Sequence, residues 1–427
     1  MTNICTNSKS DNEQEASYIN APELQFFVMG LFFIFGGITS LNDVMIPKLK
    51  ELFSLNYAQV MLVQSAFFAA YFVISIPGAH LVKRIGYMRG AVVGLLTMLV
   101  GCLLFIPASY SAKFIIFLLA LFVLASGVTI VQVVTNPLIS LLGPSKTSHS
   151  RLTFAQAFNS LGTTIFPYLG SLIILGGLNK IDPKTIDAAA LAVYRATETQ
   201  VIVKTYLFLA LAILIIASVV WMNRNRLVGE KHETGSFFRS FNLLKEKRFG
   251  LGVACIFLYV GAEVAIGSLI VNYLMQSHTL GLTEQDAGKH IPLYWGGALI
   301  GRFIGSAVLR MFRPGLVLAA VAAGAITLIL ISSNSSGIIA GYSLLAIGLM
   351  NSIMFPTIFS LASENLGTRA ADGSGIICVA IVGGAIIPPL TGVAADITHS
   401  LAASLTIPAL CYLMIASYGF YTSKASS

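Results

Sequence analysis

The stretch 26-FFVMGLFFIFGGITSLND-43 consists of uncharged residues until it ends at Asp43. A helix of about 20 apolar residues crosses the roughly 30 Å hydrocarbon core of a membrane, so this stretch predicts a membrane-spanning helix. A second carboxylate, Glu263, lies within the apolar run 256-IFLYVGAEVAIGSLIVNYL-274. A charge at the bilayer centre costs about 2.5 kcal/mol or more, and residues that carry one tend to face a water-filled path. Both carboxylates therefore indicate transport.

The composition of the whole chain supports this interpretation. Of its 427 residues, 56% are hydrophobic and only 10% are charged, whereas a typical soluble domain has about 25% charged residues. The deficit excludes an ordinary cytosolic enzyme. We predict an all-α membrane protein with twelve transmembrane helices, which lie near 25–46, 58–80, 88–107, 114–140, 153–176, 202–222, 250–274, 290–310, 315–333, 337–361, 372–394 and 400–421.

Basic residues are unevenly distributed between the segments that join these helices. With a cytoplasmic N-terminus, the inner segments carry 17 of the 26 Lys and Arg residues and the outer segments carry 7. This split follows the positive-inside rule, so we expect both termini in the cytoplasm and a multi-pass protein of the bacterial inner membrane. The net charge of +8 then sets orientation and does not indicate nucleic-acid binding.

The polar segment 224–249 divides the chain into two related halves. The sequences 162-GTTIFPYLG-170 and 384-GAIIPPLTG-392 share the pattern G-x4-P-x2-G and fall in the fifth predicted helix of each half. Pro137 and Pro356 correspond in the same way in the fourth predicted helix of each half, at nearly the same separation. Two such halves, related by an axis along the membrane normal, are typical of the major facilitator architecture. The predicted parts are a disordered cytoplasmic tail, an N-terminal six-helix bundle, a cytoplasmic interdomain loop, a C-terminal six-helix bundle and a short tail, at 1–23, 24–223, 224–249, 250–422 and 423–427.

Polar side chains inside the apolar helices are the candidate binding residues. Amide groups both donate and accept hydrogen bonds, which suits the hydroxyl groups of a sugar, and Phe35 or Trp295 could stack on a sugar ring. Only Arg302 lies deep in a helix, which favours a neutral substrate over a carboxylate or phosphate. The candidate substrate-binding residues are Gln132, Asn136, Gln156, Asn159, Phe35, Glu263, Asn272, Tyr273, Trp295 and Asn351. Of these, Asn351 and Tyr273 also fit a structural role.

Other interpretations stay open for the remaining polar residues. Asp43 could lie at the outer mouth of its helix, within reach of water. Glu263 could be a structural partner of Arg302, and the pair would then hold two helices together. The pair Gln132 and Asn136, spaced i, i+4 on one helix face, could form interhelical hydrogen bonds worth about 1 kcal/mol.

Six segments together resemble the fucose–galactose–glucose–H+ symporter family of the major facilitator superfamily. The resemblance covers the chain from about 25 to 420. The segments are 41-LNDVMIPKLK-50, 135-TNPLISLLG-143, 151-RLTFAQAFNSLGTTIFP-167, 259-YVGAEVAIGSLIVNYL-274, 294-YWGGALIGRFIGS-306 and 355-FPTIFSLASENLG-367.

The resemblance implies a twelve-helix fold with alternating access around a central sugar site. It implies cation coupling at Asp43, which matches the proton-coupling aspartate of the family, and it matches the family's helix-5 amides to Gln156 and Asn159. The second essential acid of the fucose-transporting members is replaced by Gln132, and their helix-1 tryptophan by Phe35. The replacement at Gln132 makes the chain resemble the glucose/galactose branch and puts a two-carboxylate proton relay in doubt.

We therefore predict a secondary active transporter that imports a neutral hexose, such as glucose, galactose or mannose, by symport with a cation. H+ is favoured and Na+ is second, since Asp43 with Thr39 and Asn42 offers the oxygen ligands that a hard cation prefers. We expect no cofactor besides the co-transported ion, no resident metal, no nucleic-acid partner, and a monomer in the lipid bilayer.

Other classes of function are less favoured. A drug or metabolite exporter of the same superfamily would have a more apolar cavity with fewer amides. A membrane enzyme would need a nucleophile–base pair or a metal cluster, which the sequence does not show. Two related halves suit a carrier better than a channel.

Overall fold

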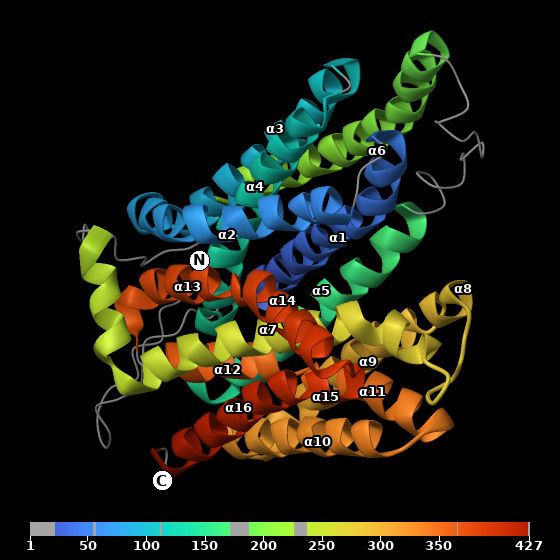
Figure 1. Ribbon diagram of the computed structural model, residues 1–427. Coiled ribbons are helices and arrows are strands. Elements are labelled where there is room, and N and C mark those ends of the chain that lie inside the picture. The colour runs from blue at the N-terminus through green and yellow to red at the C-terminus, as the bar shows by residue number, and fades with distance from the viewer. Residues whose placement is uncertain are drawn as a thin grey trace. The chain divides into compact units, whose positions relative to one another are not determined.

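The computed structural model of the chain describes residues 22–53, 57–111, 113–170, 188–225, 237–364 and 366–425. Every regular element in these ranges is a helix (Figure 1), which confirms the all-α prediction for the part of the chain described. The predicted tail 1–23 lies almost wholly outside these ranges, as does part of the predicted loop 224–249. The division of the chain into two halves at this loop stays a prediction.

The described residues group into two compact units that differ in extent from the predicted halves. The N-terminal unit comprises 30–135 and 161–225, and the C-terminal unit comprises 22–29, 136–160 and 237–425. Helices α1, α4 and α5 each contribute to both units.

The N-terminal unit consists of long helices held together by close backbone approaches. Its helices are α1 (Pro22–Phe53), α2 (Tyr57–Ile85), α3 (Tyr87–Ser111), α4 (Phe114–Leu141), α5 (Ser148–Gly170) and α6 (Ala188–Met222). Helix α3 packs along α6 and against α2. A Cβ at Gly162 on α5 would lie 2.0 Å from the Phe33 carbonyl oxygen on α1, and one at Gly101 on α3 would lie 2.5 Å from the Leu124 nitrogen on α4. Only glycine permits these approaches.

The C-terminal unit contains the remaining helices. These are η1 (Ser145–Thr147), η3 (Phe237–Lys245), α7 (Lys247–Met275), α8 (Glu284–Gly288), α9 (Ile291–Met311), α10 (Pro314–Asn334), α11 (Gly337–Asn351), α12 (Met354–Ser363), η4 (Gly367–Arg369), α13 (Ala370–Ala380), α14 (Gly383–Thr398), α15 (Leu401–Ser404) and α16 (Thr406–Ala425). Helix α7 packs against α14, α16 and α12, while α10 packs along α16 and α11, and α9 along α11.

Proline sets where several of these helices start and break. Pro292 and Pro314 lie in the first turns of α9 and α10, where a missing N–H costs nothing. One predicted span near 337–361 is divided into α11 and α12 after Asn351. Pro356 accounts for this break, because it offers no N–H to the carbonyl of Ser352 four residues earlier.

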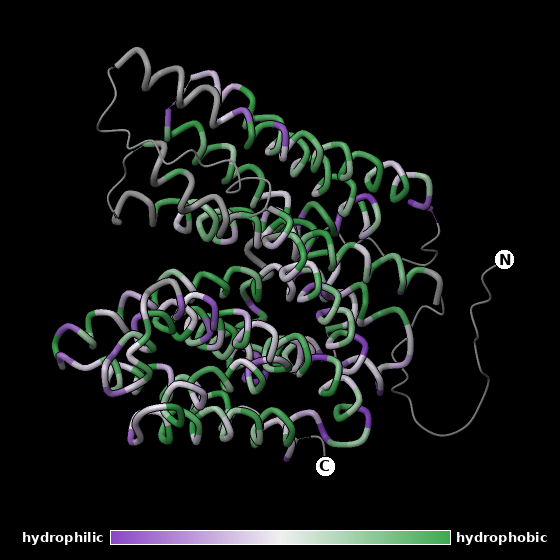
Figure 2. The backbone as a smooth tube through the Cα atoms, turned by 90° about the vertical axis from the view of Figure 1, so that its right-hand side faces the viewer, coloured by the Kyte–Doolittle hydropathy of each residue, from purple (hydrophilic) through white to green (hydrophobic). Residues whose placement is uncertain are grey.

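Ten segments of the described chain are long and apolar enough to cross a membrane, with α11 and α12 forming one segment and α13 and α14 another. Apolar residues run along most of these helices, and many of the hydrophilic stretches lie at their ends (Figure 2). Helices α5 and α9 lie where two further spans are predicted but do not reach this threshold. Both carry polar side chains that the site below depends on.

The glycine approach between α14 and α7 gives a testable consequence. A Cβ at Gly383 would lie 2.0 Å from the Phe257 carbonyl oxygen, so Gly383→Ala must push two helix backbones apart. We expect a loss of about 1–3 kcal/mol of stability, as for other overpacked cores. Thermal unfolding of the detergent-purified protein measures this.

Gly392 on the same helix provides the control, because nothing lies within 4 Å of the position that a Cβ would take there. Gly392→Ala should leave stability unchanged or raise it by up to about 1 kcal/mol, since alanine favours a helix over glycine. Equal unfolding temperatures for the two variants would contradict the packing described here.

Candidate functional site

Arg302 on α9 is a polar centre of the C-terminal unit. Its Nε donates to the Ser352 carbonyl oxygen at 3.1 Å, the group that Pro356 leaves without a helical donor. Its Nη1 donates to the Gln156 carbonyl oxygen at 3.1 Å and to the Ser160 hydroxyl, both on α5. The guanidinium is therefore occupied by protein oxygens from α5 and the α11–α12 break.

A second half-buried group, Glu263 on α7, makes a different set of contacts. Tyr259 lies one turn earlier, and its hydroxyl oxygen is 2.8 Å from Glu263 Oε1 and 3.0 Å from the Asn351 carbonyl oxygen. None of the ion pairs among the described residues joins Glu263 to Arg302. The structure thus places the two groups in separate hydrogen-bonded clusters.

Asn351 is the last residue of α11 and is fully buried. Its Oδ1 accepts from the Tyr412 hydroxyl at 2.7 Å, and its Nδ2 donates to the Tyr294 hydroxyl at 2.8 Å. Tyr294 in turn donates to the backbone oxygen of Glu263 at 3.2 Å. Asn351 therefore connects α7, α9, α11 and α16.

The predicted amides of α4 and α5 meet within the C-terminal unit. Gln156 Nε2 lies 3.4 Å from Asn136 Oδ1, and both residues are buried. The Asn136 Nδ2 group is also buried, and no described residue accepts a hydrogen bond from it. Asn159, one turn beyond Gln156, is half-buried. A buried amide donor without a protein partner is suited to a ligand hydroxyl, because leaving it unpaired costs about 1–3 kcal/mol.

In the N-terminal unit, Gln132 accepts a hydrogen bond at 2.8 Å from the hydroxyl of Tyr71 on α2. Phe35 on α1 is buried beside Phe32, with ring centroids 5.2 Å apart. Thr39 donates to the Phe35 carbonyl oxygen at 2.7 Å. Asn42 and Asp43 continue α1, but their side chains lie outside the described set. The structure therefore shows only that Asp43 lies on α1, and the cation site around it stays a prediction.

Three other predicted residues make none of the hydrogen bonds of these clusters. Asn272 and Trp295 are exposed, and the Trp295 side chain has a relative exposure of 43%. Tyr273 is buried and donates to the Ser332 carbonyl oxygen at 2.8 Å, joining α7 to α10. This contact fits the structural interpretation of Tyr273, and its part in substrate binding stays a prediction.

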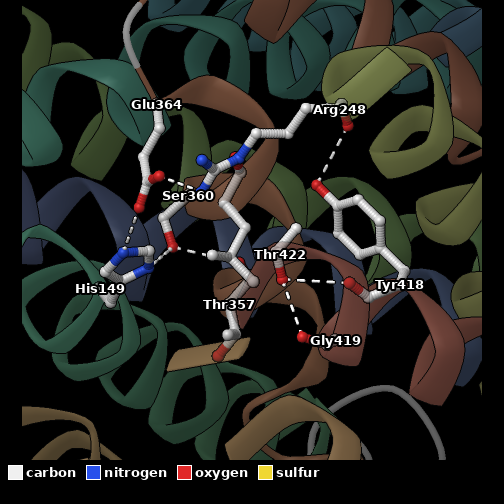
Figure 3. A network of polar contacts seen from close by, with 9 residues as sticks. His149, Arg248, Thr357, Ser360, Glu364, Tyr418, Gly419 and Thr422 are labelled. Atoms are coloured by element: carbon white, nitrogen blue, oxygen red, sulfur yellow. Dashed lines mark hydrogen bonds and ion pairs between the residues drawn. The ribbon is translucent and has the colours of Figure 1, made fainter. Parts of the chain in front are cut away.

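A third polar cluster connects the start of α5 with α7 and α12 (Figure 3). His149 Nε2 lies 2.9 Å from a carboxylate oxygen of Glu364, and Nδ1 lies 2.6 Å from the Ser360 hydroxyl. Arg248 donates to the other Glu364 oxygen. Next to His149, the Ser150 hydroxyl donates to the Ser306 carbonyl oxygen at 2.8 Å.

The Ser360 hydroxyl lies between two acceptor groups of this cluster. Its oxygen is 2.7 Å from the Pro356 carbonyl oxygen and 2.6 Å from His149 Nδ1. A hydroxyl has one hydrogen, so its direction decides whether Nδ1 accepts or donates.

Sequence reasoning missed most of these partners. Tyr259 is the exception in principle, because it lies four residues before Glu263 on one helix face, which is a signal for contact. Tyr412 and Asn351 are 61 residues apart, and His149 and Glu364 are 215 residues apart. Nothing in a single sequence pairs them. Among the described residues no group of three His, Cys, Asp or Glu residues could hold a metal ion.

Arg302→Lys tests the first cluster. A lysine ammonium cannot reproduce the planar fork that reaches the carbonyls of Ser352 and Gln156 together. Leaving one buried carbonyl unpaired should cost about 1–3 kcal/mol of stability. Thermal unfolding compares this variant with Arg313→Lys, an exposed arginine at the start of α10 that should tolerate the change. Equal losses would show that the carbonyl contacts do not stabilise the fold.

Comparison with known proteins places these features in a family. The family model described as Major Facilitator Superfamily matches residues 28–389 of the chain. The glucose/galactose transporter of Brucella abortus is 48% identical over 92% of this chain and 93% of its own length. The L-fucose-proton symporter of Escherichia coli is 31% identical over 100% of this chain and 99% of its own.

A solved structure agrees with this result. The crystal structure of the Escherichia coli fucose:proton symporter has a TM-score of 0.86 and 29% identity, and the match covers 94% of this chain and 98% of that one. The resemblance predicted from the sequence is thereby confirmed. The chain belongs to the Major Facilitator Superfamily.

Proposed function

We propose that this protein is a secondary active transporter that imports a neutral hexose together with a cation, most favourably H+. Its family and its relatives are transporters and not enzymes, and the relatives are named for glucose, galactose and fucose. The observation that carries the proposal is a set of buried amides inside apolar helices, with one amide donor left unpartnered at Asn136.

The occupied arginines support a neutral substrate. Arg302 donates to oxygens of Ser352, Gln156 and Ser160. Arg151, a buried arginine, donates to the carbonyl oxygens of Ile139, Ser140, Gly143 and Pro144 and to the Thr147 hydroxyl, and so caps the end of α4. Both guanidinium groups serve the fold. An anionic sugar would have to displace these contacts to gain a partner.

The proposed sugar site takes its polar groups from α4 and α5. Asn136 and Gln156 lie together, and Asn159 lies one helical turn beyond Gln156. Their amides can donate to and accept from adjacent sugar hydroxyls, which a carrier must bind without changing them. Gln132 and Phe35 belong to the N-terminal unit, and their part in sugar binding stays a prediction from the sequence.

Asp43 is the proposed coupling residue. A carboxylate on a membrane helix is costly when ionised, so binding a cation lowers the cost of enclosing it in a dry site. In the proposed cycle Asp43 takes up the cation from outside, sugar binds, and the halves then close over both and reopen inside. Thr39 and Asn42 on the same helix would complete an oxygen site if the cation were Na+.

The proposed membrane arrangement has twelve crossings, with α5 and α9 counted beside the ten apolar segments. The positive-inside distribution supports cytoplasmic termini, and the bacterial relatives support the inner membrane. We propose that the protein acts as a monomer, since each chain carries both halves.

Uptake into proteoliposomes tests the substrate and the cation together. Wild-type protein should concentrate glucose, galactose or a related hexose when an inward H+ gradient is imposed. An inward Na+ gradient alone should give no accumulation. Accumulation driven only by Na+ would overturn H+ coupling, and a failure to move any of a panel of hexoses would overturn the proposed substrate class.

Asp43→Asn separates coupling from binding. The amide cannot take up a proton, so the accumulation ratio of sugar should fall. Exchange of labelled for unlabelled sugar should persist, because exchange needs no net cation movement. Asp286→Asn, a half-exposed carboxylate paired with Lys289, is the matched control and should accumulate sugar normally. Undiminished accumulation by Asp43→Asn would disprove its role.

Ser150 and Ser306 allow a test of alternating access. Their hydroxyl oxygens lie 3.2 Å apart and join α5 of the predicted N-terminal half to α9 of the other. In the double variant Ser150→Cys, Ser306→Cys, an oxidised crosslink should stop uptake, and a reductant should restore it. Ser150→Ala with Ser306→Ala should transport under both conditions. Full uptake by the crosslinked protein would show that this contact does not open during the cycle.

A further inference from the structure

The hydroxyl of Tyr259 has one hydrogen but faces two acceptors. Its oxygen lies 2.8 Å from Glu263 Oε1 and 3.0 Å from the carbonyl oxygen of Asn351. Tyr259 and Asn351 are buried, with relative exposures of 1% and 0%, so bulk water does not stand in for a missing partner. A tyrosine can donate only one hydrogen bond, so the protonation of its neighbours decides whether both contacts are hydrogen bonds.

The state of Glu263 determines the outcome. An ionised carboxylate only accepts, so Tyr259 would donate to it, and the tyrosine oxygen would face the Asn351 carbonyl with no hydrogen between them. If Glu263 carries a proton, the acid donates to Tyr259 and Tyr259 donates to Asn351. Both short contacts are then hydrogen bonds, and the network is complete.

No other group in the network can supply this hydrogen. The Asn351 amide donates to Tyr294, and Tyr294 donates to the backbone oxygen of Glu263. Tyr412 donates to the side-chain oxygen of Asn351. Each of these hydrogens is already used in a contact of 2.7–3.2 Å. The carboxyl group of Glu263 must therefore carry the hydrogen that turns both Tyr259 contacts into hydrogen bonds.

The surrounding charges are few. Arg302 on α9 is the cation that acts electrostatically on Glu263, and its own hydrogen bonds go to Ser352, Gln156 and Ser160. The helices that pack along α7 carry their charged residues near their ends, namely Asp372 on α13, Asp396 on α14 and Lys424 on α16. Glu263 is the carboxylate at the centre of this group of helices.

The internal repeat gives independent support. The separation of Glu263 from Asp43 along the chain falls between that of Pro356 from Pro137 and that of Gly384 from Gly162, the positions that repeat in the two predicted halves. The two carboxylates thus occupy equivalent positions on the first helix of each predicted half. In a chain built from two repeats, Glu263 therefore lies at the position that corresponds to Asp43.

We propose that Glu263 is a second proton-binding residue of the transport cycle, which gains a proton to join Tyr259 to the Asn351 carbonyl and loses it again on release. The inference rests on the proposed function, sugar–proton symport. Each cycle would then move two protons, one at Asp43 and one at Glu263. Loss of the second proton would free the contact between α7 and the end of α11.

The accumulation ratio at steady state tests this stoichiometry. One unit of pH difference supports about tenfold accumulation for each coupled proton, so two protons give about 100-fold and one gives about tenfold. Wild-type proteoliposomes should approach the higher value when the membrane potential is clamped at zero. Glu263→Gln should approach the lower value, because the glutamine amide donates permanently to Tyr259.

Control variants separate coupling from structure. Tyr206→Phe removes a buried tyrosine hydroxyl on α6 for which no described residue is a hydrogen-bond partner, and it should keep the wild-type ratio. In Glu263→Gln, exchange of labelled sugar should persist, which shows that the site is intact. Tyr259→Phe removes the shared hydroxyl and should lower the ratio as Glu263→Gln does.

A measurement on protein in detergent keeps the test decisive even if Glu263→Gln folds poorly. In the Asp43→Asn variant, infrared difference spectra between acid and alkaline buffer should retain the carbonyl stretch of a protonated carboxylic acid, which is that of Glu263. Adding Tyr259→Phe to this variant should shift the band. If that band is unaffected by Tyr259→Phe, the inference is wrong.

The outcomes distinguish the inference from the function beneath it. A wild-type ratio near 100-fold that Glu263→Gln leaves unchanged would overturn the role of Glu263 alone, as would a wild-type ratio near tenfold. Absence of any proton-driven accumulation in the wild type would overturn symport with H+ and the second proton site with it.

Discussion

Every polar group inside a membrane-spanning helix needs a partner within the protein, because hydrocarbon offers none. The structure follows this constraint at its irregular points. Where Pro356 removes an N–H, the Ser352 carbonyl is taken up by Arg302. Where α4 ends, Arg151 gathers its last carbonyls. Arg302 and Arg151 could have bound a charged substrate, but both bind backbone carbonyls instead. The neutral substrate that we propose fits this use of the arginines at helix ends and breaks.

The same constraint gives meaning to the groups that have no partner. Thr and Ser hydroxyls along the helices mostly donate to the carbonyl four residues earlier, as Thr129 does to Ala125 and Thr391 does to Ile387. The Asn136 amide on α4 is a buried donor for which no described residue is a hydrogen-bond partner, and it lies beside Gln156 of α5, where we propose that sugar binds. A transporter must leave some polar groups available for its substrate. The number of such groups is limited, because each buried group without a partner lowers stability.

Much of the fold could be predicted from sequence, because hydrophobic length is a strong signal in membrane helices. The positions of the helices, Asp43 on the first of them and the amides Asn136 and Gln156 all follow from the order of residues. The contact of Tyr259 with the Asn351 carbonyl does not follow from it, since the two residues are 92 positions apart. The suggested pairing of Glu263 with Arg302 shows the same limit: a chain reveals which charges are buried, and only packing decides which oxygens meet them.

Helix α12 spans only Met354–Ser363, ten residues, or about 15 Å at 1.5 Å per residue. Its first turn follows the break beside Asn351, and its last turn carries Ser360, next to Glu364, which both hold His149. A rod this short cannot bend appreciably along its length. A change of angle at the break would therefore be transmitted to the far end of the helix, where it would move Ser360 and Glu364 relative to His149.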